Sequence, residues 1–318
     1  MEPRRLVVLG AGAIGASLGA LLYEAGAPVV LVARGANGRA ITERGVDLRL
    51  PSGSRTVRVP CVEDVRALDV TADDLVMLTT MGQHTAEAIE PIARDVCVAS
   101  FQNGISPIER IYDRGHPTLA AMVYVPAERR APGVFALSQV PTFGCVLIGG
   151  WPSGHTPWCD WLARRLAAVG FAAEAEADIA PWIGAKTLAN LAGIVVALCD
   201  DPPSDVVDAA RAEAIAVFRA ANVPCRSIAD LSARVGETRL VEVDGVMRKG
   251  GSTRAALARG DALETRSIHG TVIDLGRERK MATPINDALV ALADRAVRER
   301  LPAGSMSAAS LRVAVGLG

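Results

Sequence analysis

The chain has 318 residues, which exceeds the size at which one hydrophobic core usually serves a whole chain, so two domains are expected. Half of the residues are apolar, but Gly, Pro or charged residues interrupt the apolar runs before they reach the ~20 residues of a membrane span. Lys and Arg (34) nearly balance Asp and Glu (35), and only 4% of the residues are aromatic, so we expect neither a nucleic-acid partner nor a membrane partner.

The first half of the chain alternates between strand-like and helix-like patterns. Short runs rich in Val, Leu and Ile predict strands at 6–9, 29–32, 75–78 and 96–100. Continuous apolar strands separated by helices indicate a parallel sheet that is covered on both faces. Further strands are predicted at 118–125, 133–137 and 144–148, with a helix at 157–168, and we expect them to extend the same sheet.

The pattern changes after about residue 176, where strand-like runs give way to Ala-rich helical spacing. Helices are predicted at 180–199, 205–221, 228–234, 264–279 and 284–299. Thr283-Pro284 is typical of a helix start, with an N-cap before a proline at the first helical position. We expect residues 308–318 to be loosely ordered.

A glycine-rich segment directly follows the first predicted strand. Residues 10–15 are Gly-Ala-Gly-Ala-Ile-Gly and lead into a helical run, which places a G-x-G-x-x-G pattern in a strand–turn–helix context. The first glycine permits a tight turn, the second lets the backbone approach a pyrophosphate, and the third lets the helix pack on the strand. The predicted dinucleotide-binding residues are Gly10, Gly12, Ala13, Ile14 and Gly15. The alternative is a glycine-rich turn that serves packing alone.

The second predicted strand ends in Arg34 and not in a carboxylate. Enzymes that use NAD usually carry Asp or Glu at this position for the ribose 2′-hydroxyl. Arg34, with help from Arg39, could pair with a 2′-phosphate through its planar fork of donors. The sequence therefore favours NADP, and the alternative is that Arg34 is a solvated loop residue.

The predicted fold is α/β, with an N-terminal Rossmann-type doubly wound sheet over residues 1–178 followed by an all-helical C-terminal domain over residues 179–318. Asn103 follows the strand predicted at 96–100, and the carboxyl ends of parallel strands are where such sheets bind ligands. By itself, Asn103-Gly104 is more often only a turn.

Together with these features, several motifs resemble those of the ketopantoate reductase (2-dehydropantoate 2-reductase) family, and the likeness runs through the whole chain. They are the glycine loop, Asn103-Gly104, the segment from Trp182 through Lys186 to Asn190, Gly251-Ser252-Thr253 ahead of Glu264, the segment 268–270, and the segment 282–286. The resemblance implies reduction of a 2-oxo acid to a 2-hydroxy acid with NADPH, and it suggests a homodimer.

The resemblance also implies roles for individual residues. Lys186 would be the general acid that protonates the keto oxygen as hydride arrives. Asn103 would lie beside the nicotinamide and that lysine, Asn190 and Glu264 would bind the hydroxyl end of the substrate, and Ser252 would hold its carboxylate. Without the resemblance, Lys186 would be taken for a solvated helix residue and Glu264 for a first-turn carboxylate favoured by the helix dipole.

Three positions depart from the family pattern. Ile194 replaces a second asparagine one turn beyond Asn190, Thr80 replaces a lysine after the strand at 75–78, and Arg266 places a cation where the family tends to have an acid. A site that loses a hydrogen-bonding partner for a substrate hydroxyl discriminates less strongly for that hydroxyl. Two alternatives therefore remain, namely a relative that acts on a less polar oxo or hydroxy substrate, and an NADP-binding sensor without catalysis.

The cysteines and histidines give no sign of a metal site or of export. Six cysteines are scattered singly without a C-x-x-C pair or a histidine at ligand spacing, so reduced thiols and no metal are expected. The first apolar run is too short for the ~7–15 residues of a signal-peptide core. We therefore expect a cytoplasmic protein.

Overall fold

The computed structural model describes residues 2–318, which form two compact units. The first unit contains the chain up to Gln102, Pro107–Ala180 and Ser232–Arg248. The second contains Asn103–Ser106, Pro181–Leu231 and Lys249–Gly318. The boundary predicted between 178 and 179 lies close to the departure of the chain from the first unit, but residues 232–248 return to that unit.

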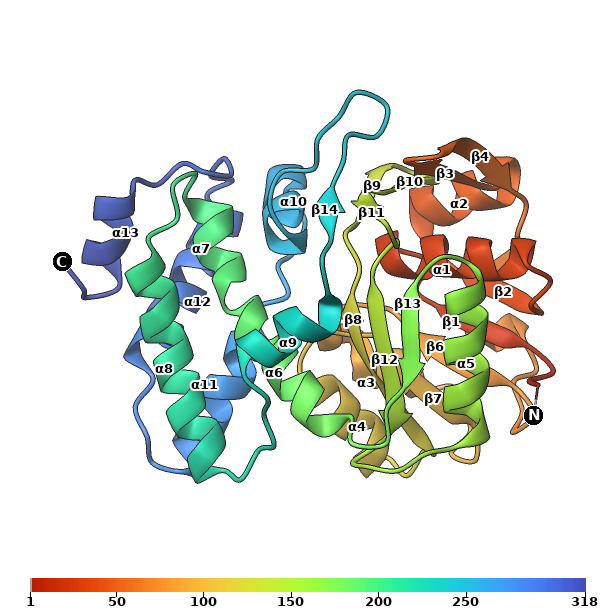
Figure 1. The fold of residues 1–318 in the computed structure, drawn as a ribbon, viewed down its shortest axis with the longest axis horizontal. Coiled ribbons are helices and arrows are strands. Elements are labelled where there is room, and N and C mark those ends of the chain that lie inside the picture. Colours follow the sequence, from red (N-terminus) through yellow and green to blue (C-terminus); the bar gives the residue numbers. More distant parts are fainter. Residues whose placement is uncertain (1) are drawn as a thin grey trace. The chain divides into compact units, whose positions relative to one another are not determined.

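The first unit is built mainly from strands. Its elements are β1 (Leu6–Leu9), α1 (Ala13–Glu24), β2 (Val29–Val32), α2 (Gly35–Arg44), β3 (Val46–Leu50), β4 (Gly53–Val57), β5 (Cys61–Val62), β6 (Leu75–Leu78), α3 (Thr85–Ile89), β7 (Cys97–Ser100), α4 (Ser106–Asp113), β8 (Thr118–Tyr124), β9 (Ala127–Ala131), β10 (Val134–Leu137), β11 (Gln139–Val140), β12 (Cys145–Gly150), α5 (Pro157–Ala168), β13 (Ala172–Ala175) and β14 (Arg239–Leu240). Figure 1 shows their arrangement.

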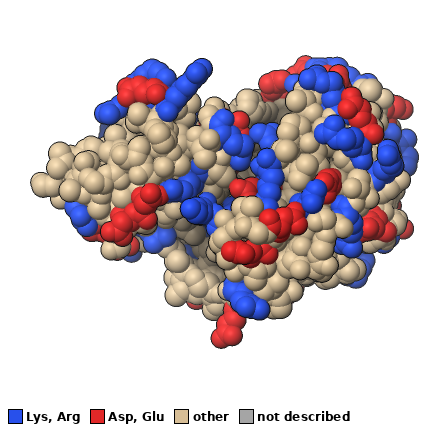
Figure 2. All heavy atoms as spheres, turned by 90° about the horizontal axis from the view of Figure 1, so that it is seen from above, with Lys and Arg blue, Asp and Glu red and all other residues tan. Residues whose placement is uncertain are grey.

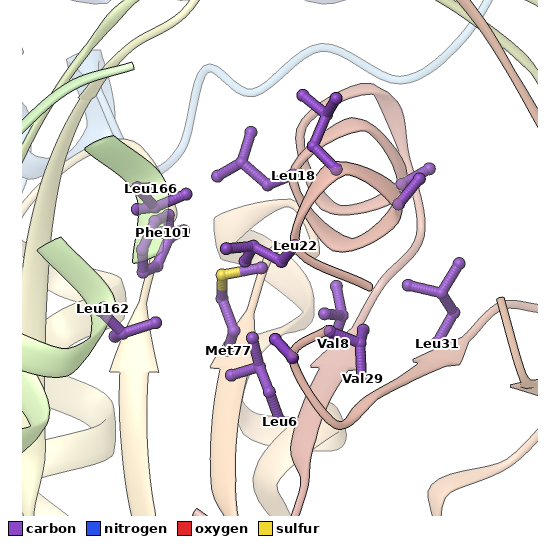
Figure 3. Close-up of a cluster of buried hydrophobic side chains, with 14 of the residues drawn as sticks. Leu6, Val8, Leu18, Leu22, Val29, Leu31, Met77, Phe101, Leu162 and Leu166 are labelled. Atoms are coloured by element: carbon purple, nitrogen blue, oxygen red, sulfur yellow. The ribbon is translucent and has the colours of Figure 1, made fainter. Parts of the chain in front are cut away.

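The main sheet has eight strands in the order β13-β12-β8-β7-β6-β1-β2-β5. Within this sheet, β8, β7, β6, β1, β2 and β5 run parallel to one another. β12 is antiparallel to β8. One face packs against α1 and α5, where Leu22 of α1 lies beside Met77 of β6 (Figure 3). The other face packs against α3 and α4. Helices on both faces and continuous apolar strands make this a doubly wound sheet, as predicted.

A second sheet, in the order β4-β3-β10-β9, belongs to the same unit. The strand predicted at 133–137 lies in this sheet as β10, so the expectation that it extends the main sheet was wrong. Its partner β3 alternates apolar with charged residues, which is the pattern of a half-buried strand. A search for continuous apolar runs does not find such a strand. β10 pairs in parallel with β3 and antiparallel with β9.

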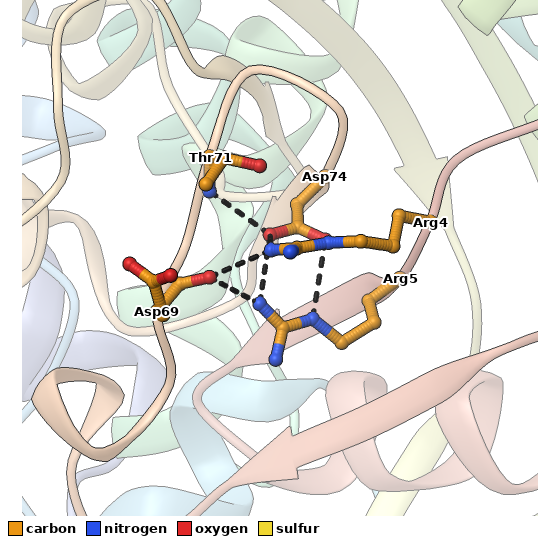
Figure 4. Close-up of polar contacts among 5 residues, drawn as sticks. All are labelled: Arg4, Arg5, Asp69, Thr71 and Asp74. Atoms are coloured by element: carbon orange, nitrogen blue, oxygen red, sulfur yellow. Dashed lines mark hydrogen bonds and ion pairs between the residues drawn. The ribbon is translucent and has the colours of Figure 1, made fainter.

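An ionic cluster fixes the start of β1 next to the start of β6 (Figure 4). The buried Asp74 carboxylate accepts hydrogen bonds from Arg4 Nε at 3.0 Å, Arg5 Nε at 3.1 Å and the Thr71 amide at 3.0 Å. Burial alone would raise the pKa of Asp74, but these hydrogen bonds outweigh it and hold that pKa well below its usual range. The carboxylate therefore joins the two strand entrances as a charged, hydrogen-bonded group.

The second unit is helical. Its elements are α6 (Ala180–Asn190), α7 (Ala192–Leu198), α8 (Ser204–Ala220), α9 (Ile228–Val235), α10 (Ser252–Arg259), α11 (His269–Glu278), α12 (Pro284–Arg298) and α13 (Ala308–Ala314). A core of α7, α8, α10 and α12 side chains holds it together, with Leu198, Val206 and Leu289 at most 1% exposed. Thr283 is the N-cap of α12 and Pro284 lies in its first turn, as predicted.

The helices differ from the predictions in four places: two have other limits, and two were not predicted. The helix predicted at 180–199 is interrupted at Leu191. The helix predicted at 264–279 begins only at His269, since residues 266–268 form a turn and residues 264–265 have no regular structure. α10 lies in a Gly-flanked polar stretch without helical apolar spacing. Residues 308–314, expected to be loosely ordered, form α13, because the Ser307 side chain accepts from the Ser310 amide and Leu311 is fully buried.

The run Ala180–Leu198, which comprises α6 and α7, is long and apolar enough to cross a membrane by length and composition. In this structure 61% of its apolar window is buried inside the protein. Core helices of soluble proteins pass the same test, so the run is weak evidence for a membrane span.

Candidate functional site

The glycine loop between β1 and α1 has the shape that a dinucleotide needs. Gly10 has a φ of +109°, and a Cβ there would lie 2.8 Å from Thr80, so only glycine fits. A Cβ at Gly15 would overlap the Gly10 carbonyl and the Thr79 hydroxyl. By contrast, nothing lies within 4 Å of the Cβ position of Gly12, which leaves space for a ligand to approach the backbone.

The N-terminus of α1 is available for an anion. Gly12 is its N-cap and offers no side-chain cap, and no acidic residue lies in the first turn. The first amides of a helix have no intrahelical acceptor and carry partial positive charge, which suits a pyrophosphate at Ala13, Ile14 and Gly15. The residues present therefore fit a dinucleotide cofactor.

Asn37 supports this loop and was missed in the sequence. Its Nδ2 atom donates to the Ala11 carbonyl at 2.7 Å, and its Oδ1 atom accepts from the Gly133 amide at 3.0 Å. The side chain thus ties the glycine loop to the turn between β9 and β10. The only available signal was its position on the helix after β2, which does not reveal a contact with a distant turn.

Arg34 lies at the carboxyl end of β2 and is the N-cap of α2. Its Nη1 atom is 3.1 Å from Glu87 Oε1, and its Nη2 atom is 3.8 Å from Asp64 Oδ2. All three side chains are largely solvent-exposed, so these ion pairs contribute little to stability. The guanidinium is therefore accessible to an incoming phosphate, in competition with two carboxylates.

Gln102 organises the carboxyl ends of β6 and β7. Its Nε2 atom donates to the Thr80 carbonyl at 2.9 Å and to Thr80 Oγ1 at 3.1 Å, and its Oε1 atom accepts from Thr85 at 3.1 Å. Thr80 is the residue that stands where the family pattern has a lysine. In this chain the hydrogen bonds among Gln102, Thr80 and Thr85, all uncharged, therefore stand beside the glycine loop where the family pattern has a lysine ammonium group.

Asn103 is the centre of a polar cluster in the helical unit. Its Oδ1 atom accepts from Asn190 Nδ2 at 3.0 Å, and its Nδ2 atom donates to Glu264 Oε2 at 2.8 Å. The two bonds fix the orientation of the Asn103 amide. Three residues predicted from separate motifs are thus brought together.

Lys186 lies one turn before Asn190 on α6 and is partly buried. Residues four apart occupy the same face of a helix, so the ammonium group and the Asn190 amide share one face of α6. The next residue, Thr187, is fully buried and bonds to the Ile183 carbonyl. The side of α6 that carries Thr187 therefore faces the interior, and Lys186 is only partly covered.

Gly104 determines where Asn103 lies. Its φ is +89°, and a Cβ would overlap the backbone carbonyl of Ser267. The same carbonyl accepts from Thr271 Oγ1 at 3.0 Å, in the first turns of α11. Close backbone approach at Gly104 therefore sets Asn103 against the segment that carries Glu264.

The remaining predicted residues lie elsewhere in the helical unit. Ser252 is the first residue of α10 and is exposed. Ile194 is 2% exposed and belongs to the apolar core of the unit. Arg266 is exposed and lies in the turns before α11, so the prediction that a helix presents this cation was wrong.

A buried histidine anchors α11. His269 Nδ1 lies 2.9 Å from Asn286 Oδ1, and Asn286 Nδ2 donates to Glu213 Oε2 at 2.7 Å. Burial lowers the pKa of His269 to about 4, although the Asn286 hydrogen bond opposes that shift. The imidazole is therefore neutral at physiological pH.

Within residues 2–318 there is no group of three or more His, Cys, Asp or Glu that could hold a metal ion.

The first unit is a Rossmann-type dinucleotide-binding fold, joined to a helical unit with a clustered polar site. The chain belongs to the ketopantoate reductase family. The model described as "Ketopantoate reductase PanE/ApbA" matches residues 6–149, and its C-terminal counterpart matches residues 185–296.

Curated relatives agree with this membership. The chain is 30% identical to the 2-dehydropantoate 2-reductase of Pyrococcus horikoshii over 59% of its own length, and the match spans 61% of that relative. It is 28% identical to the 2-dehydropantoate 2-reductase of Mesorhizobium japonicum, over 93% of this chain and 98% of the relative.

Solved structures share the fold. A PanE/ApbA family ketopantoate reductase from Ralstonia eutropha JMP134 has a TM-score of 0.77 and 26% identity, and covers 93% of this chain and 99% of its own. A D-mandelate dehydrogenase in a ternary structure with NADH and anilino(oxo)acetate has a TM-score of 0.76 and 20% identity, over 93% of this chain and 99% of its own. The second likeness concerns the fold alone.

Proposed function

We propose that this protein is an NADPH-dependent oxidoreductase of the cytoplasm that reduces a 2-oxo acid to a 2-hydroxy acid, with ketopantoate (2-dehydropantoate) as the first candidate substrate. The observation that carries the proposal is Asn103, hydrogen-bonded to both Asn190 and Glu264, in the unit that also presents Lys186. The open space at Gly12 and the uncapped start of α1 support cofactor binding. Family membership supports the reaction class.

The cofactor, when bound, supplies the hydride that adds to the keto carbon. Lys186 then has two tasks at the keto oxygen, since an ammonium group stabilises the developing negative charge and donates the proton that completes the hydroxyl group. The lysine regains its proton from solvent. One 2-oxo acid, one hydride and one proton thus give one 2-hydroxy acid.

Asn103, Asn190 and Glu264 hold the substrate in this proposal. The carboxylate of Glu264 accepts a hydrogen bond from a substrate hydroxyl, and the Asn190 amide serves the same end of the molecule. In the free protein Asn103 already satisfies both partners, so the polar groups are positioned before substrate arrives. Ser252, at the exposed start of α10, binds the substrate carboxylate.

Arg34 decides the choice of cofactor in this proposal. No carboxylate ends β2, and the exposed guanidinium pairs bidentately with a 2′-phosphate better than with a ribose hydroxyl. The weak ion pairs to Glu87 and Asp64 are replaced when the phosphate binds. NADPH is therefore expected to bind more tightly than NADH.

A second candidate substrate is a less polar 2-oxo acid. Ile194 stands one turn beyond Asn190, where the family pattern has an asparagine, and its side chain lies in an apolar core. An apolar residue at this position removes a partner for a substrate hydroxyl. The D-mandelate dehydrogenase of the same fold is named for a 2-hydroxy acid with an aromatic substituent, which makes aromatic 2-oxo acids worth testing.

The test is consumption of NADPH, followed by its absorbance, with ketopantoate and with a panel of 2-oxo acids that lack the hydroxyl group. Rapid oxidation with ketopantoate supports the first candidate, and selective oxidation with an aromatic or aliphatic 2-oxo acid supports the second. Tight NADPH binding without turnover of any 2-oxo acid would favour the sensor and contradict an enzyme. The family likeness further suggests a homodimer, which light scattering measures.

A further inference from the structure

Within the helical unit, α10 packs against α7. Leu257 of α10 is buried in the apolar core that α7 side chains help to form. Near the start of α10, Arg254 donates from Nη1 to the Val196 carbonyl at 3.0 Å, and its Nη2 atom pairs with Asp200. The first turn of α10 therefore has a defined place beside α7.

The side chain of Thr253, in that first turn, lies against a glycine of α7. A Cβ at Gly193 would lie 2.8 Å from Thr253 Oγ1 and 3.5 Å from Thr253 Cβ. The first distance is too short for a real contact, so the Thr253 hydroxyl group occupies space that a side chain at 193 would need. The glycine thus lets this hydroxyl group lie directly on the surface of α7.

Gly193 belongs to the face of the helix that carries the proposed site. Leu191, between α6 and α7, keeps helical torsion angles (φ −61°, ψ −19°), so the path of α6 continues into α7. Asn190 is four residues after Lys186, and Gly193 is three residues after Asn190. This spacing places all three on one helical face, and all three are partly exposed. The Thr253 hydroxyl group therefore lies over the turn that continues the face of Lys186 and Asn190.

The Thr253 hydroxyl group is available to a ligand. The side chain is partly exposed, and its Oγ1 atom makes no hydrogen bond with another residue of the range 2–318. α7 consists of Ala, Gly, Ile, Val and Leu, so it offers no hydrogen-bonding side chain of its own. At the turn after Asn190, a hydrogen-bonding group is thus supplied by α10.

We propose that Thr253 binds the hydroxyl group of a hydroxylated 2-oxo acid and makes the enzyme prefer such a substrate. The inference rests on the proposed function, in which the neighbouring Asn190 already serves the hydroxyl end of the substrate. A threonine hydroxyl both donates and accepts, as the substrate hydroxyl does, so the two groups pair in either direction. Thr253 thereby offers the partner that Ile194 lacks, which favours ketopantoate over less polar acids.

The test compares Thr253→Val, which removes the hydroxyl group and keeps the shape, with Thr253→Ser, which keeps the hydroxyl group. For each protein, kcat/KM is measured for ketopantoate and for trimethylpyruvate, which is ketopantoate without its hydroxyl group. The readout is the ratio of the two values, because loss of folded protein affects both substrates alike. We expect T253V to lower the ratio about tenfold, as loss of one neutral hydrogen bond does. T253S should keep the ratio within about twofold of the wild type.

Gly193→Ala tests the placement of the hydroxyl group. Its methyl group needs the space of Thr253 Oγ1, whereas alanine itself favours the helical conformation of α7. We expect G193A to lower the same ratio in the wild type and to leave it unchanged in T253V. A further fall in the double variant would contradict an action of Gly193 through Thr253.

The outcomes separate the inference from the proposed function. If the wild type prefers ketopantoate and T253V keeps that ratio, the assignment of Thr253 is wrong and the proposed function stands. A wild type that reduces trimethylpyruvate as well as ketopantoate also overturns the assignment and leaves the reaction class standing. If T253V reduces neither substrate, the assignment is again wrong, because a partner of the substrate hydroxyl is not needed for trimethylpyruvate. If the wild type reduces no 2-oxo acid, the proposed function fails and this inference fails with it.

Discussion

Asn103 Nδ2 donates a hydrogen bond of 2.8 Å to Glu264 Oε2, although 161 positions separate the two residues in the chain. The bond joins the loop between β7 and α4 to the segment that precedes α11. Because Asn190 donates to the other end of the same amide, Asn103 has one orientation in the cluster. The proposed chemistry depends on this placement, which Gly104 makes possible.

The first prediction concerns that glycine. Gly104→Ala places a side chain at a φ of +89° and against the Ser267 carbonyl. We expect the free energy of unfolding of the helical unit to fall by about 2–3 kcal/mol and kcat/KM to fall with it. The control is Gly260→Ala, at a φ of +71° with nothing within 4 Å, which should cost about 1 kcal/mol and leave activity intact. Equal effects of the two variants in urea unfolding would contradict the positioning role of Gly104.

Arg34 carries the prediction on cofactor choice. Arg34→Ala should lower kcat/KM for NADPH roughly 100-fold, because a bidentate contact with a 2′-phosphate is lost, and should change the value for NADH little. Arg44→Ala, at an exposed arginine of the same helix, is the matched control. Steady-state rates with the two cofactors measure the ratio. A wild-type preference for NADH, or an unchanged ratio in the variant, would assign another role to Arg34.

Ile194 carries the prediction on substrate. Ile194→Asn introduces a hydrogen-bonding group one turn beyond Asn190, so kcat/KM for a hydroxylated 2-oxo acid should rise about tenfold relative to its analogue without the hydroxyl group. The control is Ile194→Val, which keeps the site apolar and should leave that ratio unchanged. The ratio is used because burial of an amide in this core also lowers stability. If the ratio does not move, Ile194 does not face the substrate.

His269 gives a pH dependence of stability. Its pKa is about 4 in the folded chain against 6.5 for an unperturbed histidine, so the unfolded state takes up the proton first as pH falls. The stability that the neutral imidazole contributes is complete above pH 6.5 and is lost between pH 6.5 and 4, by up to about 3 kcal/mol. Urea unfolding at stepped pH should show this fall in the wild type and in His84→Asn, an exposed control, but not in His269→Asn. A fall of equal size in H269N would refute the assignment.

Much of the fold follows from local patterns. The apolar runs of β1, β2 and β6 have the predicted limits, because a strand buried on both faces needs a continuous apolar sequence. The β3–β4 hairpin was missed, since its strands are only partly buried and mix charged with apolar residues. The return of residues 232–248 to the sheet unit could not be predicted, because strand pairing between segments distant in sequence leaves no local signal.

The candidate site, like the fold, was predicted only in part from local sequence patterns. Asn103, Asn190 and Glu264 were found from motifs and lie together, whereas no spacing rule indicated that one amide would bridge the other two. Asn37 and Gln102 were not assigned to the site, because each acts through contacts made only after folding.

Lys186 is the residue on which the proposed chemistry depends, and Lys186→Ala is its most direct test. The measurement is the rate of NADPH oxidation with the best 2-oxo acid, together with the dissociation constant of NADPH, in the wild type, in K186A and in Lys249→Ala as an exposed control. The account predicts that kcat falls by about 10³-fold in K186A with NADPH affinity unchanged, while K249A behaves as the wild type. Undiminished reduction of the 2-oxo acid by K186A would show that Lys186 is not the general acid.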